Sequence, residues 1–263
     1  MNIQIRQWMP QGWRPFLRGL RRRLRAAFYA SRSAILARLA FLPRRYCPVC
    51  DTFSPRFQDH PINGRACARC PRCGSLERHR LVHRFFTLKR EQLFRPNDRM
   101  LHFAPERCLV PYFESIPSLE YETADLNGKK AHLVIDVTDI PLPDRSFDLV
   151  YCSHVLEHVN DDITAMSELY RILKPGGSAV ILVPIIDAAT YEDPDITDPN
   201  ERARLFGQHD HVRRYGLDIV TRLSAAGFNV QLFSITDIAG EDEIEIMGLD
   251  CPGCREIFLC SKH

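Results

Sequence analysis

The chain has 263 residues, of which 45% are apolar and 26% are charged, so a sizeable core can form and global disorder is excluded. No stretch of 18 apolar residues occurs, and the best candidate, residues 26–42, is broken by Arg32 and Arg38, so no membrane-spanning helix is expected. Residues 1–46 contain eleven arginines and neither lysine nor acid, so the formal net charge of +2 conceals a body of charge −9. Such an acidic body is a poor general nucleic-acid binder.

Residues 1–45 are predicted to form a basic amphipathic helical arm. Apolar residues recur at three- and four-residue steps between Phe16 and Phe28, and Trp8 and Trp13 lie just upstream. This composition is typical of a helix that lies on a membrane surface and contacts anionic headgroups. A solvated helix packed on the body or on a partner, and an RNA-binding arm, are the alternatives.

Residues 46–95 are predicted to form a zinc ribbon followed by a linking helix. Two Cys-Pro-x-Cys turns, Cys47 with Cys50 and Cys70 with Cys73, are separated by 19 residues, which is typical of a four-thiolate Zn²⁺ site. Four thiolates leave no open position, so the zinc would be structural. Cys67 and Cys70 also have the Cys-x-x-Cys spacing of a metal-binding pair. Only the pair of Cys70 and Cys73 repeats the proline of the first turn.

A helix is expected after the second turn, with Ser75 as its cap. Arginine and histidine residues crowd it between residues 78 and 84, either as a solvated face or as an anion-contacting surface. The clustered cysteines and the lack of a signal-peptide pattern indicate a reducing, cytoplasmic location, with contact at the inner membrane surface if the arm binds lipid.

Residues 96–263 alternate strand and helix patterns, which predicts an α/β domain with a parallel sheet. Strands are expected at 100–104, 119–126, 132–136, 147–152, 179–183, 228–235 and 256–260, and helices at 161–174 and 217–226. Asp125 and Asp136 close two successive strands. Carboxylates at such ends can accept hydrogen bonds from ribose hydroxyls or an adenine amine, although either could also be a turn residue.

Three segments in register resemble the class I S-adenosylmethionine (SAM)-dependent methyltransferases of the small-molecule type. They are residues 136–150, which follow the pattern between the third and fourth strands of that family, and residues 153–159 and 168–177, which follow the next two motifs. The resemblance covers residues 97–184 and implies a Rossmann-like, seven-stranded, mostly parallel sheet with a reversed last strand. It also implies SAM as the methyl donor.

The resemblance further implies the cofactor-binding positions. Asp125 would hold the ribose, Asp136 and Val137 the adenine, and Ser153 and His154 would lie near the methionine part. The first loop departs from the family's acidic-x-Gly-x-Gly, because His102, Ala104 and Glu106 stand at the three key positions. A similar bacterial branch combines this Leu-His-Phe-Ala-Pro-Glu loop with a Cys-Pro-x-Cys ribbon and a Ser-Leu-Glu-Arg-His-Arg helix, so a variant site is expected in which Glu106 contacts the SAM amino group.

The catalytic candidates are His211, Asp210 and His154. Residues 184–215 form a long polar stretch that is expected to be a loop, and it ends in a dense cluster that includes His211 and Asp210. A histidine can take a proton from an acceptor hydroxyl, although a well-aligned methyl transfer needs no base. The alternative is that these residues only pin the loop. Cys251 and Cys254 resemble a third metal-binding turn, but a second site would need two more ligands and His263 is the only obvious neighbour, so a surface turn is expected.

The sequence therefore predicts a SAM-dependent methyltransferase that acts on a small-molecule, sugar or lipid-linked acceptor. An RNA methyltransferase is less well supported, because no aromatic residues interleave with the basic ones. A non-catalytic docking protein with a lost cofactor site is the third hypothesis.

Overall fold

The computed structural model describes residues 45–60, 64–128 and 131–263, so all but the last residue of the predicted arm lies outside the described residues. No helix within these ranges is long and apolar enough to cross a membrane.

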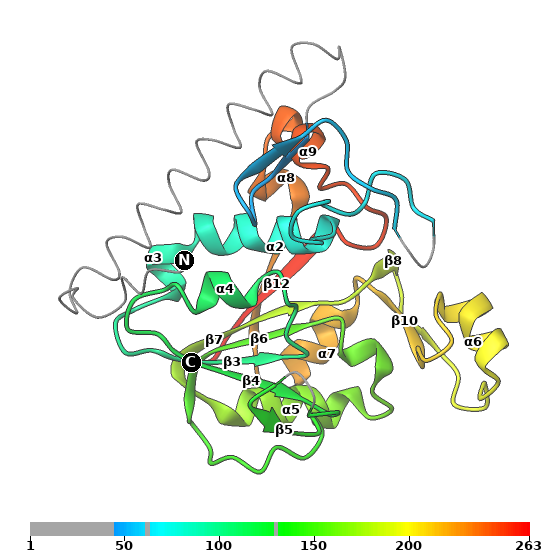
Figure 1. The fold of residues 1–263 in the computed structure, drawn as a ribbon. Helices are drawn as coiled ribbons and strands as arrows, with labels where there is room; N and C mark the ends of the chain where they lie inside the picture. Colours follow the sequence, from blue (N-terminus) through cyan, green and yellow to red (C-terminus); the bar gives the residue numbers. More distant parts are fainter. Residues whose placement is uncertain (1–44, 61–63, 129–130) are drawn as a thin grey trace, which may run out of the picture.

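A seven-stranded sheet forms the centre of the main body, with the strand order β11-β12-β7-β6-β3-β4-β5 (Figure 1). Its strands are β3 (Arg99–Phe103), β4 (Glu120–Asp125), β5 (Leu133–Val134), β6 (Phe147–Ser153), β7 (Leu173–Leu182), β11 (Asn229–Ser234) and β12 (Glu256–Ser261). Strands β3 to β7 are parallel, whereas β12 runs antiparallel to both β7 and β11. The predicted Rossmann-like sheet with one reversed strand is therefore confirmed.

Helices cover both faces of the sheet, because the apolar side chains of its strands alternate between two cores. In β6, Val150 and Cys152 pack with α5 (Asp162–Ile172) and α7 (Ile219–Ala225). Leu149 and Tyr151 face the opposite way, toward α2 (Glu77–Leu88), α4 (Val110–Phe113), α8 (Ile235–Ile238) and α9 (Glu241–Met247). A short helix, α3 (Arg90–Leu93), follows α2.

The cysteine turns lie beside a two-stranded antiparallel sheet of β1 (Arg45–Cys47) and β2 (Thr52–Ser54), above α2 in Figure 1. The N-cap of α2 is Leu76 rather than Ser75, whose hydroxyl oxygen instead lies 3.1 Å from Sγ of Cys47. His79 and Arg80 are buried, so for these two α2 residues neither a solvated face nor an anion-contacting surface is correct.

Residues 184–215 are not a plain loop, which corrects the expectation from their polarity. They contain β8 (Ile185–Asp187), β9 (Tyr191–Glu192), α6 (Pro199–Phe206) and the start of β10 (Arg213–Gly216), and the three strands form a small sheet. The bounds of α6 have local causes. Asp198 accepts hydrogen bonds from the backbone N–H groups of Asn200 and Glu201, and Gly207 ends the helix at φ 96°.

The helix predicted over residues 161–174 ends earlier, at Ile172, and β7 begins at the next residue. The Pro-Gly-Gly stretch lies within this strand and does not form a separate stop. A Cβ on Gly177 would lie 2.9 Å from the carbonyl oxygen of Lys174 and 3.0 Å from that of Asp148, so close backbone approach requires glycine there.

Candidate active site

A pocket of 230 Å³ opens at the carboxyl ends of β3, β4 and β6, and we call it the strand-end pocket. Five of the predicted cofactor-binding residues line it: Ala104, Asp125, Asp136, Val137 and His154. The other lining residues are Phe103, Ala124, Leu126, Asn127, Ile135, Val155, His158 and Val159. The pocket therefore joins apolar walls to a few carboxylate and imidazole groups, as small-molecule sites commonly do.

Each of the two carboxylates holds its own turn with one oxygen. Oδ1 of Asp125 accepts a hydrogen bond from the backbone N–H of Asn127 at 2.7 Å. Oδ1 of Asp136 accepts from the backbone N–H of Thr138 at 2.9 Å. No hydrogen bond from another described residue engages the second oxygen of either group, so each can accept one from a ligand.

Two non-glycine residues of the pocket have left-handed backbones, Ala104 at φ 50° and His154 at φ 55°. Ala104 donates its N–H to the carbonyl of Ala124, and His154 donates its N–H to the carbonyl of Leu182. The chain thus turns sharply where β3 and β6 end, at a conformational cost of about 1–2 kcal/mol per residue. Such strain is concentrated at functional sites.

His102 and Glu106 do not line the strand-end pocket. The side chain of His102 lies on the α2 and α4 side of the sheet and is fully buried. Its Nε2 is 2.7 Å from Oε2 of Glu106, and its Nδ1 is 2.8 Å from the hydroxyl of Tyr121. Tyr151 donates its hydroxyl to Oε1 of Glu106 at 3.2 Å. The predicted contact of the Glu106 carboxylate with a ligand amine therefore competes with two protein partners, His102 and Tyr151.

His79 extends this network from α2. Its Nε2 lies 4.0 Å from Oε1 of Glu106, and its Nδ1 accepts a hydrogen bond from the backbone N–H of Leu76. Burial lowers the pKa of His79 to about 3. Burial alone would raise the pKa of Glu106, but the hydrogen bond and charge of His102 lower it to about 2. Near neutral pH, Glu106 is thus an anion facing a neutral His79.

His154 and Glu157 form a pair just after the carboxyl end of β6. Nδ1 of His154 is 3.0 Å from Oε1 of Glu157, and Nε2 of His154 has no hydrogen-bond partner among the described residues. Ser153 precedes this pair and is buried, but it does not line the strand-end pocket, and its hydroxyl also has no partner within the same ranges. Of these two polar atoms, Nε2 of His154 belongs to a residue that lines the pocket and is available to a ligand there.

His211 and Asp210 lie behind this pair rather than in the pocket lining. Nδ1 of His211 is 3.0 Å from the carbonyl oxygen of Phe206, and burial lowers the pKa of His211. Asp210 is exposed, and its Oδ2 is 3.3 Å from Nδ1 of His158. The rings of His158 and His211 contact each other edge to face, with their centroids 4.7 Å apart. Three imidazoles and two carboxylates are thus gathered beside the pocket.

The sulfur atoms of Cys47, Cys50, Cys70 and Cys73 lie within 4.8 Å of one another, and Cys67 is not among them. The Sγ–Sγ distance is 3.6 Å between Cys47 and Cys73 and 3.8 Å between Cys50 and Cys70. Tetrahedral zinc with Zn–S bonds of about 2.3 Å requires separations of about 3.8 Å, so the four sulfurs fit that ion.

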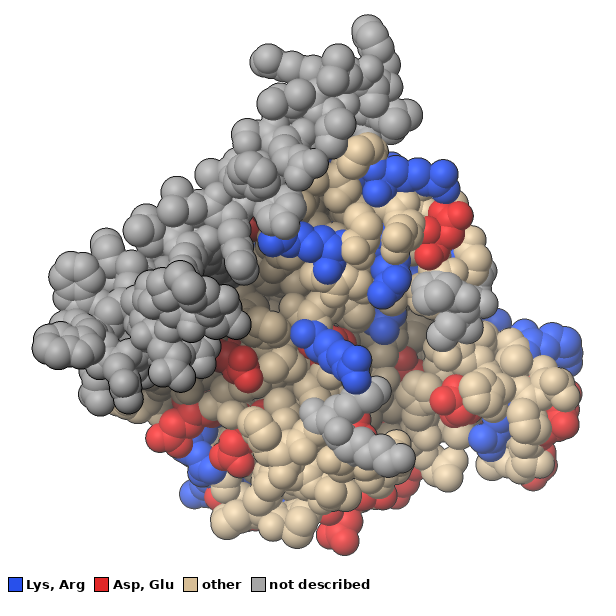
Figure 2. Space-filling model, in the orientation of Figure 1, with Lys and Arg blue, Asp and Glu red and all other residues tan. Residues whose placement is uncertain are grey.

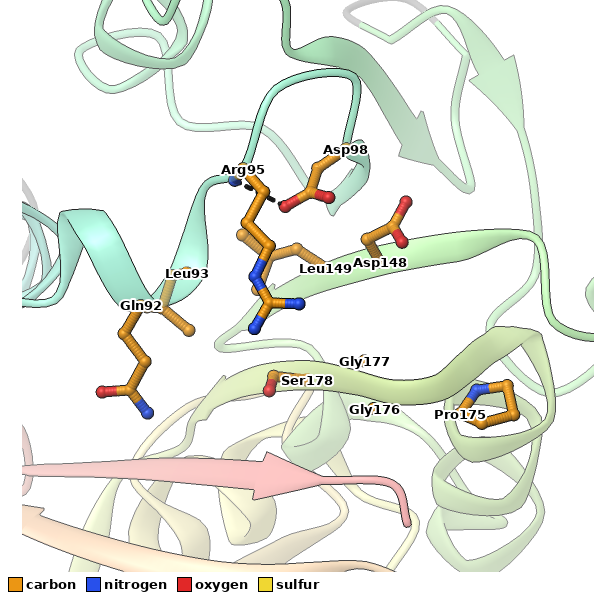
Figure 3. Close-up of a pocket in the computed structure, with 10 residues that line it drawn as sticks. All are labelled: Gln92, Leu93, Arg95, Asp98, Asp148, Leu149, Pro175, Gly176, Gly177 and Ser178. Carbon is orange, nitrogen blue, oxygen red and sulfur yellow. Dashed lines mark hydrogen bonds between the residues drawn. The ribbon is translucent and has the colours of Figure 1, made fainter.

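A smaller pocket of 100 Å³ lies at the opposite ends of the strands (Figure 3). Arg95 and Asp98 stand before β3, and the backbone N–H of Arg95 donates to Oδ2 of Asp98 at 2.7 Å. Asp148 lies near the start of β6, and Pro175 lies early in β7. This end of a parallel sheet is not the one at which ligands bind.

Sequence reasoning missed Glu157 and His158 as site residues, as well as the contact of His79 with Glu106. The three-residue spacing of His154 and Glu157 in the Ser-His-Val-Leu-Glu-His stretch was the available signal. The partner of His79 lies 27 positions away on another element, and no local pattern reports that contact.

Residues 115–181 match a sequence family described as a methyltransferase domain. An uncharacterised 37.1 kDa transposon protein of Streptomyces fradiae is 32% identical over 106 residues, which cover 40% of this chain and 26% of that protein. A demethylmenaquinone methyltransferase of Streptomyces avermitilis is 48% identical over 59 residues, 20% of this chain and 26% of that enzyme. The chain thus spans about a quarter of the length of these two curated relatives.

Among solved structures, a SAM-dependent methyltransferase from Mesorhizobium loti aligns with a TM-score of 0.47 and 17% identity. That alignment covers 68% of this chain and 98% of that one.

Proposed function

Because the chain carries a class I methyltransferase domain, we propose that it transfers the methyl group of SAM to a small-molecule acceptor. The observation that carries this proposal is the strand-end pocket, where Asp125 and Asp136, at successive strand ends, each offer a carboxylate oxygen that no other described residue engages. The net charge of −9 outside residues 1–46 favours a small acceptor over RNA. On the face shown in Figure 2, the basic side chains lie mostly on the upper and central part and the acidic ones mostly on the lower part.

The pocket residues suit the parts of SAM in order. Asp125 would accept hydrogen bonds from the ribose hydroxyls, and Asp136 would accept one from the adenine amine beside the apolar side chain of Val137. The backbone at Ala104, rather than the carboxylate of Glu106, would approach the methionine part, because Glu106 is held by His102 and Tyr151. Ser153 and His154 would lie next to the transferring methyl group.

SAM supplies an electrophilic methyl group on sulfur, and the protein's task is to align an acceptor with it. His154 is the proposed proton acceptor, because it lines the pocket and Glu157 holds its Nδ1. Nε2 of His154 would take a proton from the acceptor. The oxygen or nitrogen atom of the acceptor would then bond to the methyl carbon, and the electron pair of the S–CH₃ bond would return to sulfur. His211 and Asp210 would not contact the acceptor. They contact His158 and would influence His154 through it.

The four-cysteine cluster is proposed to hold structural zinc. Its Sγ–Sγ distances match a tetrahedral ion, and Oγ of Ser75 lies 3.1 Å from Sγ of Cys47 and 3.2 Å from Sγ of Cys73. Hydrogen bonds to metal-bound thiolates orient them and reduce their charge. The zinc would order the residues that precede α2.

Calorimetric titration of the full chain with SAM and with S-adenosylhomocysteine tests the proposal. Micromolar binding that Asp125→Ala loses, and that Asp242→Ala on the exposed start of α9 retains, is the expected result. Failure of the folded protein to bind either compound would contradict the enzymatic function and favour a docking protein.

A further inference from the structure

Three side chains with metal-ligating chemistry meet beside the strand-end pocket. Glu157 and His158 lie in the 3₁₀ turn η1 (Leu156–His158), and His211 lies two residues before β10. One ligand atom from each lies within 4.8 Å of those from the other two. Two imidazole nitrogens and one carboxylate oxygen are a donor set suited to first-row divalent metals.

Glu157 and His211 each have one polar atom engaged and one unengaged. Oε1 of Glu157 pairs with His154, and Nδ1 of His211 lies 3.0 Å from the carbonyl oxygen of Phe206. A carbonyl oxygen only accepts, so Nδ1 of His211 carries the proton and Nε2 presents a lone pair. Oε2 of Glu157 and Nε2 of His211 are buried without a hydrogen-bond partner among the described residues, and their residues are only 1% and 4% exposed. Buried electron-rich atoms such as these two require a cation or a proton donor.

In the third ligand, His158, Nδ1 also has a protein partner, as Nδ1 of His211 does. Nδ1 of His158 is 3.3 Å from Oδ2 of Asp210, so its Nε2 is the nitrogen left for a metal. Metal-binding histidines usually donate their other N–H to a carboxylate or a backbone carbonyl, which fixes the ring. Asp210 and the carbonyl of Phe206 supply one partner of each kind.

The two segments that carry the ligands are fixed to each other. The backbone N–H of Val212 donates to the carbonyl of Glu157 at 2.9 Å. The buried guanidinium of Arg213 donates to the carbonyls of Leu156 and Val159, at both ends of η1. The ligand positions are therefore set before any ion binds.

We propose that Glu157, His158 and His211 bind one divalent first-row transition-metal ion beside the part of the strand-end pocket that His154 and His158 line. Three protein ligands leave positions open for water or for an acceptor oxygen. His158 also lines the pocket next to His154, so an acceptor hydroxyl bound to the ion lies close to the proposed base. The bound ion eases loss of the hydroxyl proton to His154 before the methyl group is transferred. This role, unlike the metal binding itself, rests on the proposed function.

Cobalt(II) titration of the full chain, with one zinc already bound per chain, tests the site. A second equivalent is expected to bind with weak ligand-field absorption and no thiolate charge-transfer band, which separates this site from the cysteine cluster. His158→Gln and His211→Gln should each weaken binding more than tenfold, because even outer partners of metal ligands are worth about 10–100-fold. The matched control is His209→Gln, in the same segment but 75% exposed, and it should bind like the unaltered chain.

His158 is the decisive position if His211→Gln does not fold, because its side chain is one-third exposed. No binding beyond the zinc equivalent, or unchanged affinity in His158→Gln, overturns the proposal. SAM affinity is measured on the same samples without added cobalt. Loss of the metal site alone and failure of the cofactor site are therefore separate outcomes.

Discussion

Nη2 of Arg80 donates to the carbonyl oxygen of Gly248 at 2.7 Å, which joins α2 to the turn that ends α9. The same guanidinium donates to the carbonyls of Met247, Ala68 and Ser75. Arg80 is fully buried, and the ring of Phe57 lies 4.3 Å from its guanidinium carbon. One side chain thus connects the cysteine turns, α2 and the segment after α9.

Arg80→Met is expected to lower the free energy of unfolding by about 3–5 kcal/mol, because four carbonyl groups, most of them buried, lose a hydrogen-bond donor. Urea denaturation measures the change. Arg107→Met, at an exposed position before α4, should stay within about 0.5 kcal/mol of the unaltered chain. Equal stability of the two variants would show that the carbonyls find other donors.

Ala104→Gly is expected to raise the free energy of unfolding by up to about 1 kcal/mol, because glycine adopts the left-handed backbone at φ 50° without a Cβ penalty. SAM affinity should be kept, since the family's usual residue at this position is glycine. Ala124→Gly, at the buried end of β4, is the control and should be destabilising. A destabilised Ala104→Gly protein would mean that its methyl group packs against the pocket wall.

Replacing a cysteine of the cluster should remove zinc, whereas replacing the neighbouring cysteine should not. Cys50→Ser is expected to weaken zinc binding by more than about 100-fold, beyond the usual effect of an outer partner, and to lower the melting temperature. Cys67→Ser, outside the cluster, should retain one zinc per chain. Metal analysis after dialysis against a chelator measures both, and zinc loss from Cys67→Ser instead would reassign the fourth ligand.

Stability should fall as the pH drops from 7 to 5, because His79 binds a proton in the unfolded chain near its ordinary pKa of 6.5 but in the folded chain only near 3. The unfolded state therefore binds more protons over this interval, and His79 alone accounts for a loss of about 2 kcal/mol at pH 5. Glu106, with a folded pKa of about 2, adds its own loss only below about pH 4.5.

His79→Gln should flatten this pH dependence, measured as urea midpoints at pH 7 and pH 5. The exposed His132→Gln should leave it unchanged. An unaltered slope in His79→Gln would assign the acid sensitivity to other histidines, such as the half-buried His83, whose pKa burial lowers to about 4.

The sheet and the cysteine cluster were predictable because their signals are local. A nearly continuous apolar run defines β6, and the repeated Cys-Pro-x-Cys turns favoured Cys73 over Cys67 as the fourth member of the cluster. The small sheet of β8, β9 and β10 was missed because its strands are only two to four residues long and lie in a mostly polar stretch. The signals of α6, Asp198 with Pro199 and then Gly207, were present in the sequence but lay inside a stretch assigned to a loop.

The candidate site was only partly predictable, for a different reason. Asp125 ends β4, Asp136 lies two residues after β5 and His154 directly follows β6, so their position at the strand ends follows from the sheet. The orientation of His102 depends on which face of β3 it occupies, and its pairing with Glu106 depends on the path of the loop. The contact of Glu157 with His211 joins residues 54 positions apart, through a turn that only the folded chain defines.

The position of β12 between β7 and β11 has a consequence for how the protein is made. On the ribosome, β7 and β11 are synthesised before the strand that separates them, and β7 waits with one row of backbone groups unpaired. An open strand edge readily pairs with another chain. Insertion of Glu256–Ser261 closes this edge, so nascent chains paused before that segment are the form most prone to aggregate or to recruit chaperones.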